Sequence, residues 1–439
     1  MQANNHLVQT IDDLIQETYK ATEPGAAVIV VKDGEVIFRK GHGMANLELG
    51  VPIEPDMVFR IGSITKQFTA VAILMLVEQE KLSLDDSISK FLPDYPTQGH
   101  VITIEHLLTH TSGIKSYTNM PEWLSLWRKD FTVEELITFF KDQLMDFAPD
   151  TRWAYSNSGY TLLGAVIEKV SGQTYEQFIQ QNIFTPLGMK QSYLDSTSRL
   201  IPRRADGYDK DSEGYVNAPY ISMTQFFSAG ALTSTVDDLA IWDAALYTEQ
   251  LLKQETLQKA FIPHQLANGD PTSYGYGWGI SEYEGHLQIT HGGFIHGFLT
   301  YAIRMPNYRV FVAVFSNNGG VSSALLAFKV AASVIGKPYK DPIVIELGPE
   351  AIARYEGVYK TNDSEESRIT REENRLYSQV MQDPRVELVA YTPNEFFIKG
   401  NSPVRFRFIS DASEAVIAVE MLGYSGFIDV ARKVDENAI

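Results

Sequence analysis

The sequence contains no cysteine among its 439 residues. That absence excludes disulfide bridges, thiol nucleophiles and zinc–thiolate sites, so any nucleophile is an oxygen or an amine. Basic residues are also few, because 37 Lys and Arg stand against 55 Asp and Glu and give a formal net charge of -18. The negative electrostatic field of such a chain repels a phosphate backbone, and we therefore expect no nucleic-acid partner.

Long apolar runs are absent too. No segment approaches the roughly 18 consecutive apolar residues needed to cross a bilayer, so the sequence predicts no transmembrane segment. The opening MQANNHLVQTIDDLIQETYK has neither the basic nor the apolar region of a signal peptide. We expect a periplasmic or extracellular protein if a leader was removed from this sequence, and a cytoplasmic protein otherwise.

The first 340 residues combine strands at both ends with helices between them. Apolar spacing predicts helices over 7–19, 61–80, 133–140, 160–170, 236–246 and 322–335, and β-branched runs predict strands over 26–31, 35–40, 286–290, 297–305 and 309–317. Strands at both ends pair most simply in one antiparallel sheet with flanking helices, beside a helical lobe. The predicted fold class is α+β, an α/β sandwich with a cleft between two lobes.

The composition changes after Asp341-Pro342. Six or so short segments that alternate apolar and polar residues follow, with turn signals between them. This pattern predicts a small antiparallel β-barrel. We therefore expect two domains, 1–340 and 341–439.

Ser63 and Lys66 form the first candidate for chemistry. Residues three apart share a helix face, so a neutral lysine at this spacing can take the proton of the serine hydroxyl. The same S-x-x-K pattern occurs at 87–90 and 112–115. Ser63 is preferred because it alone opens a long apolar helix, whose buried start would lower the pKa of the lysine. The alternative is an ordinary helix N-cap.

Tyr155 and Asn157 form the second candidate, in RWAYSNSGYTLLG. A phenol can move a proton while a neighbouring amide binds a substrate carbonyl. Similar pairs occur at 117–119 and 215–217, but Tyr155 lies just before a predicted helix, from which a loop side chain can reach a cleft. The alternative is a helix-entry loop capped by Asn157 or Ser158.

His291 and Gly293 form the third candidate, at the end of a predicted strand. Glycines let a substrate approach the backbone, and an edge strand offers free N–H groups to an oxyanion. The alternative is a glycine-rich strand end with a bulge.

Further side chains have open interpretations. His106 and His110 have the spacing of two metal ligands on a helix, but packing is the simpler explanation. Tyr274 and its aromatic neighbours either line a pocket wall or pack in the core.

In this order, Ser63-x-x-Lys66, Tyr155-x-Asn157 and His291-x-Gly293 resemble the three signatures of the penicillin-recognising serine hydrolases. The supporting phrases are FRIGSITKQFTA, LLTHTSGI, YSNSGYTLLG and YGYGWGI. The resemblance covers the first 340 residues and points to the superfamily of class C β-lactamases, D,D-peptidases, D-aminopeptidases and esterases. The predicted barrel is similar to the lipocalin-like domain that some of these hydrolases carry.

This resemblance implies acyl transfer through a covalent ester on Ser63. Lys66 would be the general base, Tyr155 would relay the proton, and Asn157 would bind the substrate amide. The backbone N–H groups of Ser63 and Phe294 would form the oxyanion hole. We expect no metal and no cofactor, and a small-molecule or peptide substrate. The sequence leaves the oligomeric state open, with a homo-oligomer as one alternative.

One departure from the superfamily bears on the substrate. β-Lactamases and many D,D-peptidases have a lysine and a hydroxyl residue where this chain has His291 and Gly292, with Gly293 following. The resemblance therefore favours a D-stereospecific peptidase or amidase. The alternatives are a carboxylesterase or weak β-lactamase on the same fold, and a non-catalytic protein that binds peptidoglycan fragments.

Overall fold

The computed structural model describes residues 2–361, 366–380, 385–423 and 428–434. The chain divides into two compact units, Met1–Pro338 and Tyr339–Ile439. Nowhere in the described ranges does a helix combine the length and apolarity that crossing a bilayer requires.

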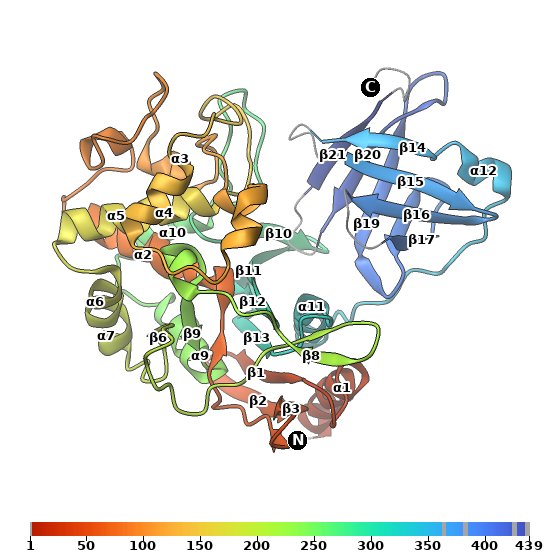
Figure 1. The fold of residues 1–439 in the computed structure, drawn as a ribbon. Helices are drawn as coiled ribbons and strands as arrows, with labels where there is room; N and C mark the ends of the chain where they lie inside the picture. Colours follow the sequence, from red (N-terminus) through yellow and green to blue (C-terminus); the bar gives the residue numbers. More distant parts are fainter. Residues whose placement is uncertain (1, 362–365, 381–384, 424–427, 435–439) are drawn as a thin grey trace. The chain divides into compact units, whose positions relative to one another are not determined.

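A six-stranded antiparallel sheet forms the centre of the first unit, in the order β10-β11-β12-β13-β1-β2 (Figure 1). The strands are β1 (Ala26–Lys32), β2 (Glu35–His42), β10 (Gly279–Tyr283), β11 (His286–Ile295), β12 (Phe298–Met305) and β13 (Val310–Ser316). Pairing of β1 with β13 joins the two ends of the unit, as the sequence predicts.

Both faces of this sheet are covered, which explains the unbroken apolar run of β1. Its side chains alternate in direction, so Ala27 and Ile29 join one core cluster while Val28 and Val30 join another. Helices α1 (Gln2–Thr18) and α11 (Ser323–Val334) lie together on one face (Figure 1). The other face carries α9 (Val236–Ala245) and the short 3₁₀ turn η1 (Gly62–Ile64).

A helical lobe packs beside this second face. Its helices are α2 (Thr65–Glu78), α3 (Ile104–Leu108), α4 (Val133–Phe140), α5 (Asn157–Ser171), α6 (Tyr175–Ile179), α7 (Thr185–Leu187), α8 (Phe227–Gly230) and α10 (Gln254–Gln258). Three small sheets complete the first unit: β3 (Met44–Asn46) pairs with β4 (Val51–Pro52), β5 (Phe59–Arg60) and β6 (Tyr193–Leu194) pair with β9 (Leu232–Ser234), and β7 (Tyr208–Lys210) pairs with β8 (Tyr215–Asn217). Helix α2 is buried on nearly all sides, which is why its sequence is too apolar for a surface helix.

The second unit is a closed antiparallel barrel, in the order β14 to β21, with β14 also paired to β21 (Figure 1). Its strands are β14 (Gly357–Lys360), β15 (Glu366–Glu372), β16 (Arg375–Val380), β17 (Val386–Ala390), β18 (Glu395–Ile398), β19 (Asn401–Ser410), β20 (Val416–Leu422) and β21 (Ile428–Val434), preceded by helix α12 (Pro349–Ala353). The barrel is confirmed, but the expectation of about six strands is wrong. Eight strands close it, and some are too short to separate in the sequence.

Side chains fill the barrel interior. Tyr359, Val419 and Ala431 are fully buried there. The ring of Phe408 packs against Tyr355 with centroids 4.4 Å apart. The barrel is therefore a packed core of its own, consistent with a domain that can fold by itself.

Candidate active site

A cavity of about 590 Å³ in the first unit collects residues from all three candidate motifs. Ser63, Tyr155, His291 and Gly293 line it together with Phe294. The two lobes therefore bring together residues that lie more than 200 positions apart in the sequence. The distances and hydrogen bonds between these side chains determine what chemistry the site can support.

Ser63 and Lys66 lie where the turn η1 passes into helix α2. The Lys66 Nζ and Ser63 Oγ atoms are 3.2 Å apart. The N-cap residues of η1 and α2 are Ile61 and Ile64, so the N-cap alternative does not describe Ser63. In each of the two rival S-x-x-K segments the lysine is paired with a carboxylate instead, Lys90 with Asp86 and Lys115 with Asp146.

The Lys66 side chain is completely buried. Its Nζ atom donates hydrogen bonds to the Asn157 Oδ1 atom and to the Ala229 carbonyl, both at 2.8 Å. Burial holds the pKa of this amine well below its ordinary value. Since no carboxylate among the described residues pairs with Lys66, its neutral form is favoured.

Asn157 begins helix α5, and the chain just before the helix fixes its side chain. Ser156 caps the helix by accepting a hydrogen bond from the Gly159 N–H at 3.2 Å. The Asn157 Nδ2 atom donates to the Thr118 hydroxyl at 3.1 Å, and its backbone N–H donates to Ser116 at 3.0 Å. The amide oxygen is thereby directed at Lys66.

The Tyr155 ring packs against the end of the lysine. The Lys66 Nζ atom stands 4.5 Å from the ring centroid. Burial raises the pKa of the Tyr155 phenol, and a hydrogen bond with Ser63 offsets part of the rise. The phenol therefore stays protonated at neutral pH and can give or pass on a proton.

His291 lies on β11 with both ring nitrogens already engaged. Its Nδ1 atom lies 2.6 Å from the Gly292 carbonyl and must carry the proton, so Nε2 accepts a hydrogen bond from the Tyr274 hydroxyl at 2.8 Å. Burial, and then the nearby Lys66, lower the pKa of His291 to about 3. The His291 side chain is therefore uncharged at neutral pH and does not supply the positive charge that a lysine would supply at this position.

The oxyanion-hole candidates meet where η1 approaches β11. Pairing of β10 with β11 ends at Thr290, so the segment that follows has no partner on that side, although β11 is not the outermost strand. A Cβ built on Gly62 would stand 2.8 Å from the Phe294 nitrogen, and one on Gly293 would stand 2.0 Å from the Ile61 carbonyl. Glycine at both positions permits this close approach.

Some residues that shape the site were not predicted. The Ala229 carbonyl and the Thr118 hydroxyl have no signature in the sequence. For Tyr274 the sequence predicts either a pocket wall or core packing, and for His110 either a metal ligand or a packing role. The His110 ring contacts Tyr155 and Tyr274, with centroids 4.3 and 4.7 Å away.

Two other histidines have structural partners. His106 accepts a hydrogen bond from the Thr103 N–H and closes a capping box on α3, so its side chain serves the helix start. His296 packs edge-on against Trp127 at 4.3 Å.

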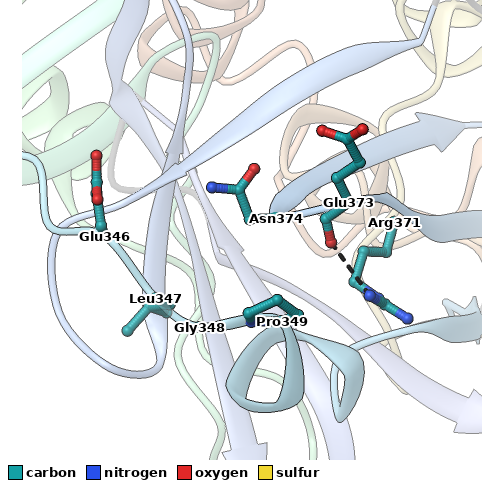
Figure 2. A pocket seen from close by; sticks show the side chains of 7 residues that line it. All are labelled: Glu346, Leu347, Gly348, Pro349, Arg371, Glu373 and Asn374. Carbon is teal, nitrogen blue, oxygen red and sulfur yellow. Dashed lines mark hydrogen bonds between the residues drawn. The ribbon is translucent and has the colours of Figure 1, made fainter.

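The barrel unit has a separate cavity of about 740 Å³. Figure 2 shows Leu347, Gly348 and Pro349 on one side, opposite Arg371 and Asn374 from the β15–β16 hairpin. Arg371 is already bound, because its side chain donates to the Glu373 carbonyl and to the Glu356 carboxylate, both at 3.1 Å. Among the described residues that line this cavity, no nucleophile lies beside a base.

Comparisons with known proteins find one matching family model and several similar chains. The family model described as Beta-lactamase matches residues 11–334. Penicillin-binding protein 4* of Bacillus subtilis (strain 168) is 30% identical, over 94% of this chain and 96% of its own length. The structure of an octameric penicillin-binding protein homologue from Pyrococcus abyssi has a TM-score of 0.67 at 28% identity and covers 97% of this chain and 99% of its own.

A third similar protein is smaller. The D-amino acid amidase from Ochrobactrum anthropi SV3, solved in complex with D-phenylalanine, has a TM-score of 0.63 at 25% identity. The match covers 71% of this chain and 92% of the amidase. The similarity to that amidase thus extends over most of its length but leaves more than a quarter of this chain unmatched.

Proposed function

The chain belongs to the beta-lactamase family, and on that premise we propose that it is a serine hydrolase that works through a covalent acyl-enzyme on Ser63. The proposal includes Lys66 as general base and Tyr155 as proton relay. Asn157, His291, Gly293 and Phe294 would bind the substrate. One observation carries it: a buried amine with a lowered pKa lies 3.2 Å from the hydroxyl that lines the cavity.

The partners of Lys66 suit the role of a base. A neutral amine has two N–H bonds and one lone pair. The Asn157 Oδ1 atom and the Ala229 carbonyl are fixed acceptors that take both N–H bonds. The lone pair is then left for the Ser63 hydroxyl, which is the starting arrangement for proton transfer.

Acylation follows from this arrangement. The Ser63 Oγ atom attacks the substrate carbonyl carbon as its proton passes to Lys66, and the carbonyl oxygen becomes an oxyanion facing the N–H groups of Ser63 and Phe294. Each such donor contributes about 3 kcal/mol to transition-state stabilisation. When the bond to the leaving group breaks, Tyr155 donates its proton to that group and regains one from Lys66.

Deacylation reverses the roles. A water molecule gives its proton through Tyr155 to Lys66 and attacks the ester carbon. The bond to the Ser63 Oγ atom breaks and the serine recovers its proton, so the product leaves as an acid. No group beyond these side chains is needed for the proton balance.

For the substrate we favour D-stereospecific peptides or amides. The similarity to a D-amino acid amidase supports this choice. The neutral His291 and the absence of a hydroxyl at Gly292 argue against efficient penicillin hydrolysis. A carboxylesterase activity on the same site is the alternative.

Labelling tests the nucleophile directly. A fluorophosphonate probe followed by peptide mass mapping should mark the peptide that contains Ser63, and Ser63→Ala should abolish the label. Lys90→Ala and Lys115→Ala, which alter the two rival segments, should leave it unchanged. A label on another serine, or no label at all, would contradict the proposal and favour a non-catalytic binding protein.

Turnover of matched substrates tests the class. We expect the p-nitroanilide of D-alanine to be hydrolysed faster than that of L-alanine, and nitrocefin to be a poor substrate. Faster turnover of p-nitrophenyl esters with no D-preference would support the esterase alternative.

We also propose that the chain associates with copies of itself. The support is its similarity, over nearly the full length of both chains, to a homologue that is described as octameric. Sedimentation velocity should give a mass that is a multiple of one chain, and a single-chain mass at micromolar concentration would contradict this.

A further inference from the structure

A histidine–aspartate pair joins the chain that leads into Tyr155 to the chain that leads into Tyr274. The His264 Nε2 atom lies 2.7 Å from the Asp150 Oδ1 atom, and 16% and 27% of the two side chains are exposed. Asp150 precedes Tyr155 in the short loop before α5, and His264 precedes Tyr274. Neither His264 nor Asp150 is among the described residues that line the cavity. Any effect of this pair on the reaction therefore passes through other residues.

Asp150 is fixed by its main chain as well as by its carboxylate. Its backbone N–H donates to the Thr111 carbonyl at 2.8 Å, and its carbonyl accepts a hydrogen bond from the Ala267 N–H at 3.0 Å. Its φ of +64° lies in the left-handed region, which aspartate tolerates better than most residues. The chain that leads into Tyr155 is thus anchored at this residue.

His264 connects the pair to the ring beside Tyr155. The His264 N–H donates to the Tyr274 carbonyl at 3.0 Å, and the His264 carbonyl accepts a hydrogen bond from the Thr272 N–H at 2.7 Å. The Tyr274 ring stands at 89° to the Tyr155 ring, with centroids 6.4 Å apart. His264 therefore holds the backbone of one tyrosine while its side chain binds the loop of the other.

Lys66 has separate supports. Its Nζ atom donates to the Asn157 Oδ1 atom and to the Ala229 carbonyl, and the segment 116–118 fixes Asn157. A change in the histidine–aspartate pair should therefore displace the phenol of Tyr155 while the base of the reaction stays in place.

We propose that His264 and Asp150 are positioning residues that hold Tyr155 where its phenol can protonate the leaving group. The proposal rests on the acyl-enzyme function above. When an amide C–N bond breaks, the nitrogen keeps the bonding electron pair and takes a proton from Tyr155, which regains one from Lys66. A 4-nitrophenolate leaves as a stable anion and needs no proton. The pair should therefore matter for amides and much less for activated esters.

Two derivatives of D-alanine that differ in their leaving groups test this directly, the 4-nitroanilide and the 4-nitrophenyl ester. Both form the same acyl-enzyme, so kcat/KM reports on the steps up to acylation. Fluorophosphonate titration counts the folded active sites, and Ser63→Ala gives the background. For His264→Ala we expect kcat/KM to fall at least tenfold with the anilide and less than twofold with the ester.

Two further variants separate positioning from a general loss of stability. His264→Gln keeps an N–H donor for Asp150, so it should recover most of the anilide activity. His286→Ala is the matched control, because His286 is also a half-buried histidine and its Nε2 atom lies 3.0 Å from the Tyr308 hydroxyl. The ratio of anilide to ester activity should stay native in this control.

A double-mutant cycle tests whether the two residues act as a unit. Asp150→Gly removes the acceptor and suits the left-handed φ. We expect this variant, and its combination with His264→Ala, each to lose about as much anilide activity as His264→Ala alone. Losses that multiply in the double variant would contradict the pairing.

The outcomes separate the two proposals. Equal losses for anilide and ester in His264→Ala, a native anilide rate in that variant, or an equal change of the ratio in His286→Ala would overturn the positioning role. Labelling of Ser63 in a native protein that cleaves the ester but not the anilide would also overturn it, because no proton would then be delivered to a nitrogen. Each of these results leaves the acyl-enzyme function standing. Failure of the fluorophosphonate to label Ser63 would instead remove the proposed function.

Discussion

Gly62 and Phe294 approach each other so closely that a Cβ on the glycine would stand 2.8 Å from the Phe294 nitrogen. Gly62 also has a φ of +51°, in the left-handed region that favours glycine. This contact sets the distance between the turn that carries Ser63 and the strand that carries the second oxyanion-hole candidate. A substitution that disrupts this contact should therefore lower kcat strongly and the stability of the fold only modestly.

The variant Gly62→Ala tests this relationship. The added methyl group pushes the turn away from β11, and we expect kcat to fall about a hundredfold, on the scale of losing one oxyanion-hole donor. Gly99→Ala is the matched control, since Gly99 has a φ of +84° with nothing within 4 Å of its added Cβ. The strained φ should cost each variant about 1 kcal/mol of stability, and Gly62→Ala should lose more than Gly99→Ala because its Cβ also meets the backbone of β11. Equal activities in the two variants would contradict the prediction.

The chemistry of Lys66 predicts a particular pH profile. Only the neutral amine accepts the serine proton, so kcat/KM should rise with pH through the pKa of Lys66. Burial lowers that pKa, and the rise should therefore be complete well below pH 10.5. His291, with a pKa of about 3, should add no step between pH 5 and 8. A midpoint near pH 10 would show that the lysine is charged in the resting enzyme.

The variant Lys66→Arg extends this test. A guanidinium stays charged at every accessible pH, so it cannot take the serine proton. We expect kcat to fall by about a thousandfold, within the range typical of a lost general base. Lys90→Arg and Lys115→Arg, which alter the rival segments, should retain native activity.

The sequence predicts much of this site because the chemistry is local. Ser63 and Lys66 share one turn, and Tyr155 and Asn157 share one helix entry, so their spacing is visible in the chain. The family assignment and the α+β fold are both confirmed. The sequence already favours Ser63 over the rival segment at 112–115, because Ser63 alone opens a long apolar helix, and the structure adds that Lys115 is paired with Asp146.

Other features depend on long-range packing and have no local pattern. The Ala229 carbonyl is a main-chain acceptor, and any residue type could supply it. Strand β10 lies in a glycine-rich stretch with few β-branched residues, and pairing with β11 rather than propensity makes it a strand. The cavity beside Ser63 combines residues of η1, β11, β12 and the segment 319–324.

His110 is expected to position Tyr155 and the start of α5. Its buried Nδ1 atom accepts the Ser156 N–H at 3.1 Å, its ring contacts Tyr155, and its φ is +61°. His110→Ala leaves that N–H unpaired, so we expect stability to fall by about 2–4 kcal/mol and kcat to fall with little change in KM.

Asparagine is the conservative replacement at this position. It tolerates a left-handed φ, and its Oδ1 atom can replace Nδ1 as acceptor. His110→Asn should therefore recover part of both stability and kcat, whereas His100→Ala, at an exposed site, should change neither. A loss of stability in His110→Ala with native kcat would assign His110 to the fold alone.

The buried Lys66 should also leave a signature in stability. Between its lowered pKa and about 10.5, the unfolded chain binds a proton at Lys66 that the folded chain does not. Stability from this group therefore rises with pH across that window, by at most about 1.4 kcal/mol per pH unit. Lys66→Met removes this dependence.

The unfolding free energy of Lys66→Met minus that of the native protein should therefore fall as pH rises toward 10.5. Urea unfolding at a series of pH values measures it, and the titrations that both proteins share cancel in the difference. The constant cost of leaving the Asn157 and Ala229 oxygens without a donor shifts the whole curve but not its slope. Parallel stability curves for the two proteins would mean that Lys66 is protonated in the folded state, and that Ser63 has no base beside it.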